Sequence, residues 1–186
     1  MGKPLIVEMD KVRDQYPEFD VGAQKLFTDA VDKAKQQWPG FTYGGQYPSA
    51  SEFGKTTLLP KFLTGYAGAA LTNYRQYFGS VNAWNQIFNK TIDEDVIHGM
   101  MGFAFPDPTI RFTELRYEIG DIKYPRINIE EINCYNQPAV IFRQGIIAME
   151  ETPFLVKGYL TSTGYQRVVP VESFTLFKKK ADVISE

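Results

Sequence analysis

Apolar residues in the first part of the chain are spaced three or four positions apart, as on one side of a helix. From Asp20 to Trp38 this spacing predicts an amphipathic helix with Asp20 as its N-cap. A second stripe with the same spacing runs from Leu58 to Phe78 and predicts a second helix. Between them, residues 40–54 are rich in Gly, Tyr, Ser and Pro, which predicts a loop.

Two more helical segments are predicted before residue 106. Ser80 is placed to cap a helix whose apolar residues are Val81, Trp84, Ile87 and Phe88. Thr91-Ile92-Asp93-Glu94 has the spacing of a helix capping box, and Gly99 or Gly102 would close that turn. Residues 1–106 are therefore predicted to be a mostly helical region.

The pattern changes to strand spacing after Pro106-Asp107-Pro108. From Thr113 to Ile119, apolar residues alternate with charged ones, which predicts a half-buried antiparallel strand with its charges outside. Later apolar runs, separated by turn residues, predict strands over Ile127–Tyr135, Ala139–Met149, Phe154–Leu160, Tyr165–Val171 and Phe174–Lys178.

The two patterns together predict an α+β fold. An N-terminal helical segment would pack on a C-terminal antiparallel β-sandwich, or a partly open barrel, formed by residues 107–186. The chain of 186 residues is long enough to bury a sizeable core without disulfides. The sequence leaves open whether the two regions are separate domains or share one core.

Aromatic residues are unusually frequent, while the charge is nearly balanced. Phe, Tyr and Trp make up 15% of the chain, and the formal net charge is -2, which gives no global field to attract a polyanion or an anionic membrane. The dense basic run Lys178–Lys180 is typical of a solvated strand end. We therefore expect no membrane partner and no nucleic acid. Without a signal-peptide core, we expect a cytoplasmic or virion protein that is not secreted.

One tripeptide, Gly54-Lys55-Thr56, matches only the end of a phosphate-binding loop. The full motif needs a glycine five positions before Gly54, where this chain has Ser49. It should also follow a buried strand, but the preceding segment is rich in turn residues. A helix start capped by Ser51 or Thr56 explains the same residues, so no cofactor is predicted.

His98 is the only histidine, which excludes zinc motifs built on paired histidines. On a helix, Asp95 would share its face and could supply a second metal ligand or orient a general base. The sequence indicates no third ligand. We predict no metal site and no catalytic residues, and keep a metal-assisted hydrolase using Asp95 and His98 as an alternative.

Cys134 is the only cysteine, which excludes a disulfide within the chain. It lies in a strand-like run and not at a helix start, where a thiol's pKa is lowered, so it is predicted to be a buried structural residue. The adjacent pairs Glu130-Glu131 and Glu150-Glu151 do not form carboxylate dyads by themselves, because neighbours on a strand face opposite sides.

Some aromatic residues are not explained by the predicted helical stripes. Tyr43, Tyr47 and Phe53 lie in the loop over residues 40–54, and Tyr77 falls beside the stripe of its helix. Aromatic residues among small, polar neighbours are typical of contact surfaces. We predict these four as interface candidates.

The sparse chemistry and the surplus of aromatic residues point to assembly. We expect a non-enzymatic structural subunit that binds copies of itself or other subunits of a larger complex; virion shell, tail and connector proteins are architectural analogues. The alternative is a small-ligand or peptide-binding β module, in which the helices form a lid and the sheet forms a cup lined by Tyr117, Tyr135, Phe142, Tyr159 and Phe174.

Overall fold

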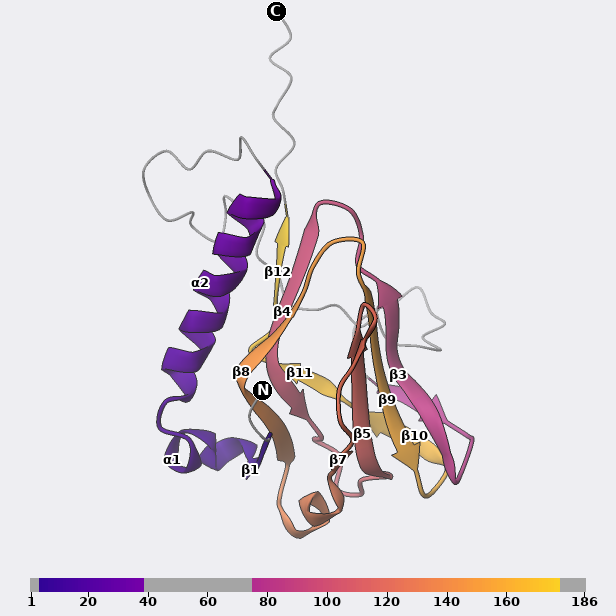
Figure 1. Ribbon diagram of the computed structural model, residues 1–186. Coiled ribbons are helices and arrows are strands. Elements are labelled where there is room, and N and C mark those ends of the chain that lie inside the picture. Colours follow the sequence, from indigo (N-terminus) through magenta and orange to yellow (C-terminus); the bar gives the residue numbers. More distant parts are fainter. Residues whose placement is uncertain (1–3, 39–74, 178–186) are drawn as a thin grey trace, which may run out of the picture.

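The computed structural model describes residues 4–38 and 75–177 (Figure 1). This part has an α+β fold in which helices near the N-terminus precede antiparallel sheets, as predicted. The helix predicted over Leu58–Phe78 lies outside the described residues as far as residue 74, and its described end is wrong, because Arg75–Phe78 is a strand. Also outside the described residues lie Tyr43, Tyr47, Phe53, the tripeptide Gly54-Lys55-Thr56 and the run Lys178–Lys180.

The chain begins with a short strand and a helical segment. The elements are β1 (Leu5–Glu8), a 3-10 turn (Met9–Lys11), α1 (Val12–Gln15) and α2 (Phe19–Gln37). The predicted helix is thus confirmed, although Asp20 lies in the first turn of α2 and Glu18 is the N-cap. The buried side of α2 is formed by Phe19, Leu26, Ala30, Val31 and Ala34. Its small alanines allow close packing on β4 and β8.

The strands form three sheets within the described residues. Sheet A has the order β1-β8-β4, and β11 and β12 both pair with β4. Its other members are β4 (Val96–Ala104), β8 (Pro138–Ala148), β11 (Val169–Val171) and β12 (Phe174–Phe177). Sheet B consists of β3 (Ala83–Thr91), β9 (Pro153–Leu160), β5 (Phe112–Ile119), β6 (Ile122–Lys123) and β7 (Ile127–Asn128). Sheet C pairs β2 (Arg75–Phe78) with β10 (Gly164–Arg167).

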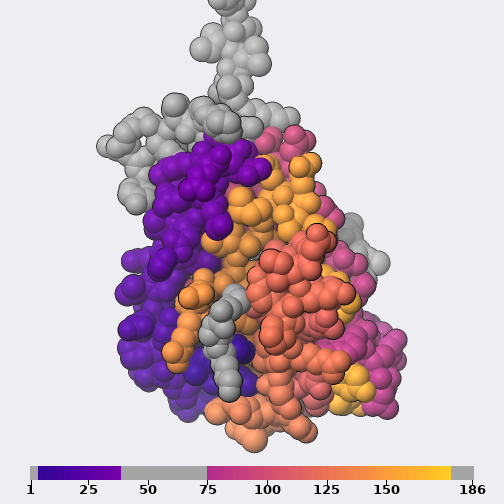
Figure 2. Space-filling model, in the orientation of Figure 1, coloured from indigo at the N-terminus to yellow at the C-terminus, as the bar shows by residue number. Residues whose placement is uncertain are grey.

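Sheet A lies in the middle of three layers, between α2 and sheet B (Figure 1). One buried cluster fills the space between sheets A and B, and it draws residues from both sides of Pro106, including Phe88 and Leu115. A second cluster lies between sheet A and the helices, where Leu26 and Met101 are buried. The indigo helical segment forms a layer along one side of the molecule in Figure 2. No helix of the described residues is long and apolar enough to cross a bilayer.

The predicted helices between residues 80 and 102 are wrong, because β3 and β4 occupy this segment. Strand β4 is buried along most of its length and so shows no alternation, while β3 contains a bulge between Gln86 and Phe88. A bulge places two consecutive residues on one side, which shifts the spacing of buried residues from two toward three or four. The Thr91–Glu94 capping box is instead part of the turn between these strands.

Beyond residue 106, the spacing of apolar residues predicts most of the strands correctly. The strands predicted over Thr113–Ile119, Ala139–Met149, Phe154–Leu160 and Phe174–Lys178 correspond to β5, β8, β9 and β12, and the run Tyr165–Val171 divides into β10 and β11. The strand predicted over Ile127–Tyr135 is wrong. Only Ile127–Asn128 is a strand, and a 3-10 helix follows over Glu130–Cys134, because the Asn128 side-chain oxygen accepts a hydrogen bond from the Glu130 N–H at 2.9 Å.

Candidate functional site

The β2–β10 pair forms a two-stranded ribbon with two different faces. In its register, Tyr77 lies opposite Tyr165, and Arg75 lies opposite Arg167. These four side chains are exposed, and we call them the ribbon face. On the other side, Gln76, Phe78 and Gln166 are buried. This is the period-two pattern of a half-buried antiparallel strand pair.

Two exposed tyrosines form the centre of the ribbon face. Tyr77 is 60% exposed and Tyr165 is 54% exposed. Their ring centroids are 5.3 Å apart at an interplanar angle of 68°, an edge-to-face contact. The Arg75 guanidinium carbon lies 4.6 Å from the centroid of the Tyr165 ring, within the range of a cation–π contact. The ribbon face is thus a pair of tyrosines next to a pair of arginines, each pair formed across the two strands.

The ribbon is fixed to the sandwich by packing and by buried amides. Phe78 packs edge-on against Phe112 with 4.8 Å between ring centroids. The Gln166 side-chain oxygen accepts from the Arg111 N–H at 3.0 Å, and its nitrogen donates to Asp107 at 3.1 Å. The same Asp107 oxygen accepts the Arg167 N–H at 2.6 Å. These contacts hold the ribbon face in one orientation before any partner binds.

A second aromatic group lies on the outer side of sheet B, which no element of the described chain covers. Trp84 and Tyr159 make an edge-to-face contact at 5.6 Å, and the Arg126 guanidinium carbon lies 5.4 Å from the Trp84 ring centroid. The predicted charged side of β5 also lies here. Its ion pairs are Arg116–Glu118 at 3.5 Å, Lys157–Glu118 at 3.6 Å and Arg126–Glu114 at 3.8 Å.

A cleft of about 660 Å³ opens between sheets A and B near β1 and β7. Tyr117 and Tyr124 stack on its wall with ring centroids 4.3 Å apart, and Phe142 packs edge-on against Tyr117 at 5.2 Å. Burial raises the pKa of the Tyr117 hydroxyl to about 12. The cleft is therefore mostly apolar and aromatic, within the size range of small-ligand sites.

The five residues predicted to line a cup do not share one cavity. Tyr117 and Phe142 line the cleft between the sheets. Phe174 packs against Phe27 of α2 at 5.3 Å, and Tyr159 lies on the outer side of sheet B. Tyr135 is half-buried after the 3-10 helix. The helices cover the outer face of sheet A, so they do not form a lid over this cleft.

Asp95 and His98 are not on a helix, contrary to the sequence interpretation. His98 lies within β4, is 1% exposed, and has its Nδ1 atom 2.7 Å from the Thr175 hydroxyl. Asp95 lies in the preceding turn, where its N–H donates to the Glu150 carboxylate at 2.8 Å. Among the described residues, no group of three or more His, Cys, Asp or Glu side chains is arranged to hold a metal ion.

The prediction of a buried Cys134 is also wrong. The residue is exposed at the end of the 3-10 helix, because the chain leaves sheet B after Asn128. Glu130 and Glu131 lie in the first turn of that helix, while Glu150 accepts a hydrogen bond from the Trp38 indole at 3.0 Å. The structure thus gives Glu150 a role in holding the end of α2.

Of the four interface candidates, Tyr77 is the one within the described residues, and it lies in the ribbon face. Sequence reasoning missed Arg75, Tyr165 and Arg167. A signal was present, since Arg75-Gln76-Tyr77 and Tyr165-Gln166-Arg167 alternate Arg and Tyr around a glutamine. Such alternation indicates one exposed side of a strand pair once the pairing is known.

Comparison with known proteins gives no relative. No protein-family model, no curated protein and no solved structure matches the chain. The class that the fold and the ribbon face define is an α+β sandwich with a preorganised aromatic and cationic surface. The functional argument therefore depends on the chemistry of that surface.

Proposed function

We propose that this chain is a non-enzymatic assembly subunit that binds copies of itself or other subunits through the ribbon face. The observation that carries the proposal is the adjacent pair Tyr77 and Tyr165, both more than half exposed, with the pair Arg75 and Arg167 beside it. Tyr and Arg are enriched among the residues that dominate binding energy in protein interfaces. Because the ribbon is fixed by buried contacts, these side chains lose little further freedom when a partner binds.

The proposal extends to the kind of assembly. A sheet-rich subunit with a preformed contact face suits a repeating structure such as a virion shell, tail or connector, and such a subunit would be found in the cytoplasm or the virion. The support is architectural: one sheet is covered by α2, whereas the ribbon face and the outer side of sheet B carry exposed or half-buried aromatic residues.

The test removes the two rings and leaves the fold in place. The variant Tyr77→Ala/Tyr165→Ala is compared with Val21→Ala/Ile122→Ala, whose side chains are 66% and 60% exposed but lie away from the ribbon. Light scattering and sedimentation velocity are measured over a wide range of protein concentrations. We expect the native chain and the control variant to form a defined oligomer, and the ribbon variant to remain monomeric. A native chain that stays monomeric at every concentration contradicts the proposal.

The cleft between sheets A and B supports a second candidate function, a small-ligand or peptide-binding module. Its aromatic walls and its size favour a flat, apolar ligand. A panel of such ligands is screened by thermal unfolding of the native chain and of Ile127→Trp, which would fill the cleft. Stabilisation of the native chain alone supports this function, and equal responses from both chains contradict it.

A further inference from the structure

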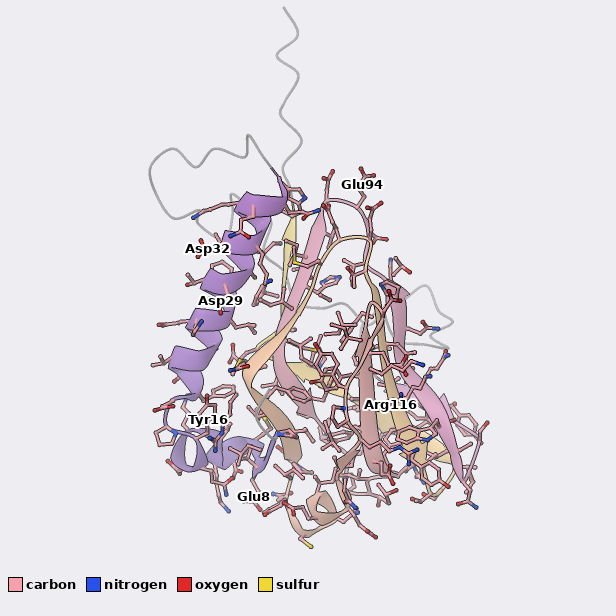
Figure 3. All side chains as sticks on the ribbon, in the orientation of Figure 1. Glu8, Tyr16, Asp29, Asp32, Glu94 and Arg116 are labelled. Carbon is pink, nitrogen blue, oxygen red and sulfur yellow. The ribbon has the colours of Figure 1, made fainter. Side chains whose placement is uncertain are left out.

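At the end of the sandwich opposite the ribbon lie two turns rich in acidic residues. The turn between β3 and β4 lies against the turn between β8 and β9, joined by hydrogen bonds from the Ile92 N–H to the Thr152 carbonyl and from the Glu151 N–H to the Ile92 carbonyl, both 3.0 Å. We call these two turns the acidic turns, because they carry the carboxylates of Asp93, Glu94, Asp95, Glu150 and Glu151. Glu94 is labelled at this end in Figure 3.

Within residues 90–95 and 149–153, which include the acidic turns, there are five carboxylates and one basic side chain, that of Lys90. Lys90 forms an ion pair with Asp93 at 3.0 Å. Glu94 and Glu151 are exposed, as is Asp93. At neutral pH these exposed carboxylates contribute negative charge at the tip of the two turns.

The ribbon and the acidic turns lie at opposite ends of the β3–β9 pair. The pairing begins with Ala83 opposite Leu160, next to the segments that lead to β2 and β10, and ends with Thr91 opposite Pro153 at the acidic turns. Strand β3 has nine residues and so spans roughly 30 Å. A copy of this chain therefore presents a cationic aromatic face at one end and an anionic surface at the other.

The charges argue against a ribbon that pairs with itself. In a two-fold contact the same face meets on both copies, so one positively charged face would meet another. Like charges brought together at an interface oppose binding, whereas opposite charges favour encounter and fix the orientation. Among the described residues, the Arg167 guanidinium has no ion-pair partner within its own chain.

From this complementarity, and resting on the proposed function, we propose that the partner of the ribbon face is the acidic turns of a second copy. Arg75 and Arg167 then pair with Glu94 and Glu151 of the next chain, while the two tyrosines beside them pack against the same turns. When two copies bind in this way, one ribbon face and one pair of acidic turns remain unoccupied, so further copies can bind and the contact repeats. It closes into a ring or continues as a filament.

The experiment uses two charge-reversed forms of the full chain. Arg75→Glu/Arg167→Glu alters the ribbon, and Glu94→Lys/Glu151→Lys alters the acidic turns. The matched control, Asp14→Lys/Lys33→Glu, reverses exposed charges on α1 and α2. We expect each reversed form alone to be monomeric by sedimentation velocity and the control to assemble as the native chain does. An equal mixture of the two reversed forms should give a mixed complex, because a native ribbon then meets native acidic turns.

The outcomes separate this inference from the proposed function. If the ribbon variants lose assembly but Glu94→Lys/Glu151→Lys keeps it, the assembly function stands and the head-to-tail contact is overturned. If neither the ribbon variants nor the acidic-turn variant changes assembly, the proposed function and the head-to-tail contact are both overturned. A single-stranded oligothymidylate that binds the native chain and not the ribbon variant, with self-assembly unchanged by the turn variant, would assign the ribbon to nucleic acid and also overturn the inference. Assembly that does not weaken as the salt concentration rises would also overturn the head-to-tail contact, since salt screens exposed charge pairs.

Discussion

Alanine substitutions at two neighbouring residues of β2 should have very different effects on the free energy of unfolding. Phe78 is 4% exposed and packs against Phe112, whereas Tyr77 is 60% exposed on the ribbon face. Truncation of a buried phenylalanine typically costs about 3–5 kcal/mol of unfolding free energy, because it removes apolar burial and leaves a cavity. Truncation of an exposed residue typically changes it by less than about 1 kcal/mol, even with a ring contact such as that to Tyr165.

The assay is urea unfolding, followed by fluorescence and circular dichroism. With a slope of roughly 2 kcal/mol per molar urea, Phe78→Ala should lower the midpoint by roughly 1.5–2.5 M, while Tyr77→Ala should shift it by less than about 0.5 M. Each variant is measured at two protein concentrations, because loss of assembly would make the native midpoint alone depend on concentration.

A large loss of stability for Tyr77→Ala, equal to that for Phe78→Ala at both concentrations, would refute the assignment of the two faces. The ribbon face would then be part of the core, and the proposed function would lose its main support. A small effect of both substitutions would also refute it, because it would mean that Phe78 does not fix the ribbon to the sandwich.

Three further predictions concern the rest of the fold. The free energy of unfolding should fall as pH rises from about 10 to about 12, because burial raises the folded-state pKa of Tyr117 from its ordinary value of 10.0 to about 12. In urea unfolding measured at several pH values, Tyr117→Phe should lose less stability over this range. Gly145→Ala should destabilise by more than about 1 kcal/mol, since its φ is 64° and an added Cβ would lie 2.5 Å from Leu26, whereas an unchanged midpoint would contradict this geometry. Trp38→Phe should cost about 1.5–3 kcal/mol in the same assay, mainly by removing the indole hydrogen bond to Glu150, and Trp38→Ala should cost more through lost burial.

The spacing of apolar residues predicts correctly the elements that are buried on one face only. Helix α2 has one buried side and one solvent side, on which Asp29 and Asp32 lie (Figure 3), so its spacing was decisive. Strand β5 has sheet A on one side and charged residues on the other, which gives alternation from Glu114 to Glu118. In both cases the fold buries one face of the element, so the spacing of apolar residues in the sequence identifies that face.

Strands β3 and β4 could not be recognised in the same way. The bulge in β3 buries the consecutive residues Ile87 and Phe88, so that with Trp84 they imitate helical spacing. Strand β4 is buried on both sides, by α2 and by sheet B, and so shows no alternation. Gly99, predicted as a helix terminator, lies against the Phe174 ring, where an added Cβ would overlap it. These features depend on partners that are distant in the sequence.

Most of the ribbon face could not be predicted from the sequence, for a related reason. Tyr77 was recognised as an aromatic residue without a place in a core, but half of the ribbon face belongs to β10, near the other end of the chain. Pairing of β2 with β10 is what turns two isolated tyrosines into one surface, with a pair of arginines beside them at one end of the ribbon. The same pairing buries Gln76 and Gln166, whose polarity gives no hint of an interior position. A contact surface built across a sheet is therefore a property of strand register, and neither contributing segment carries it alone.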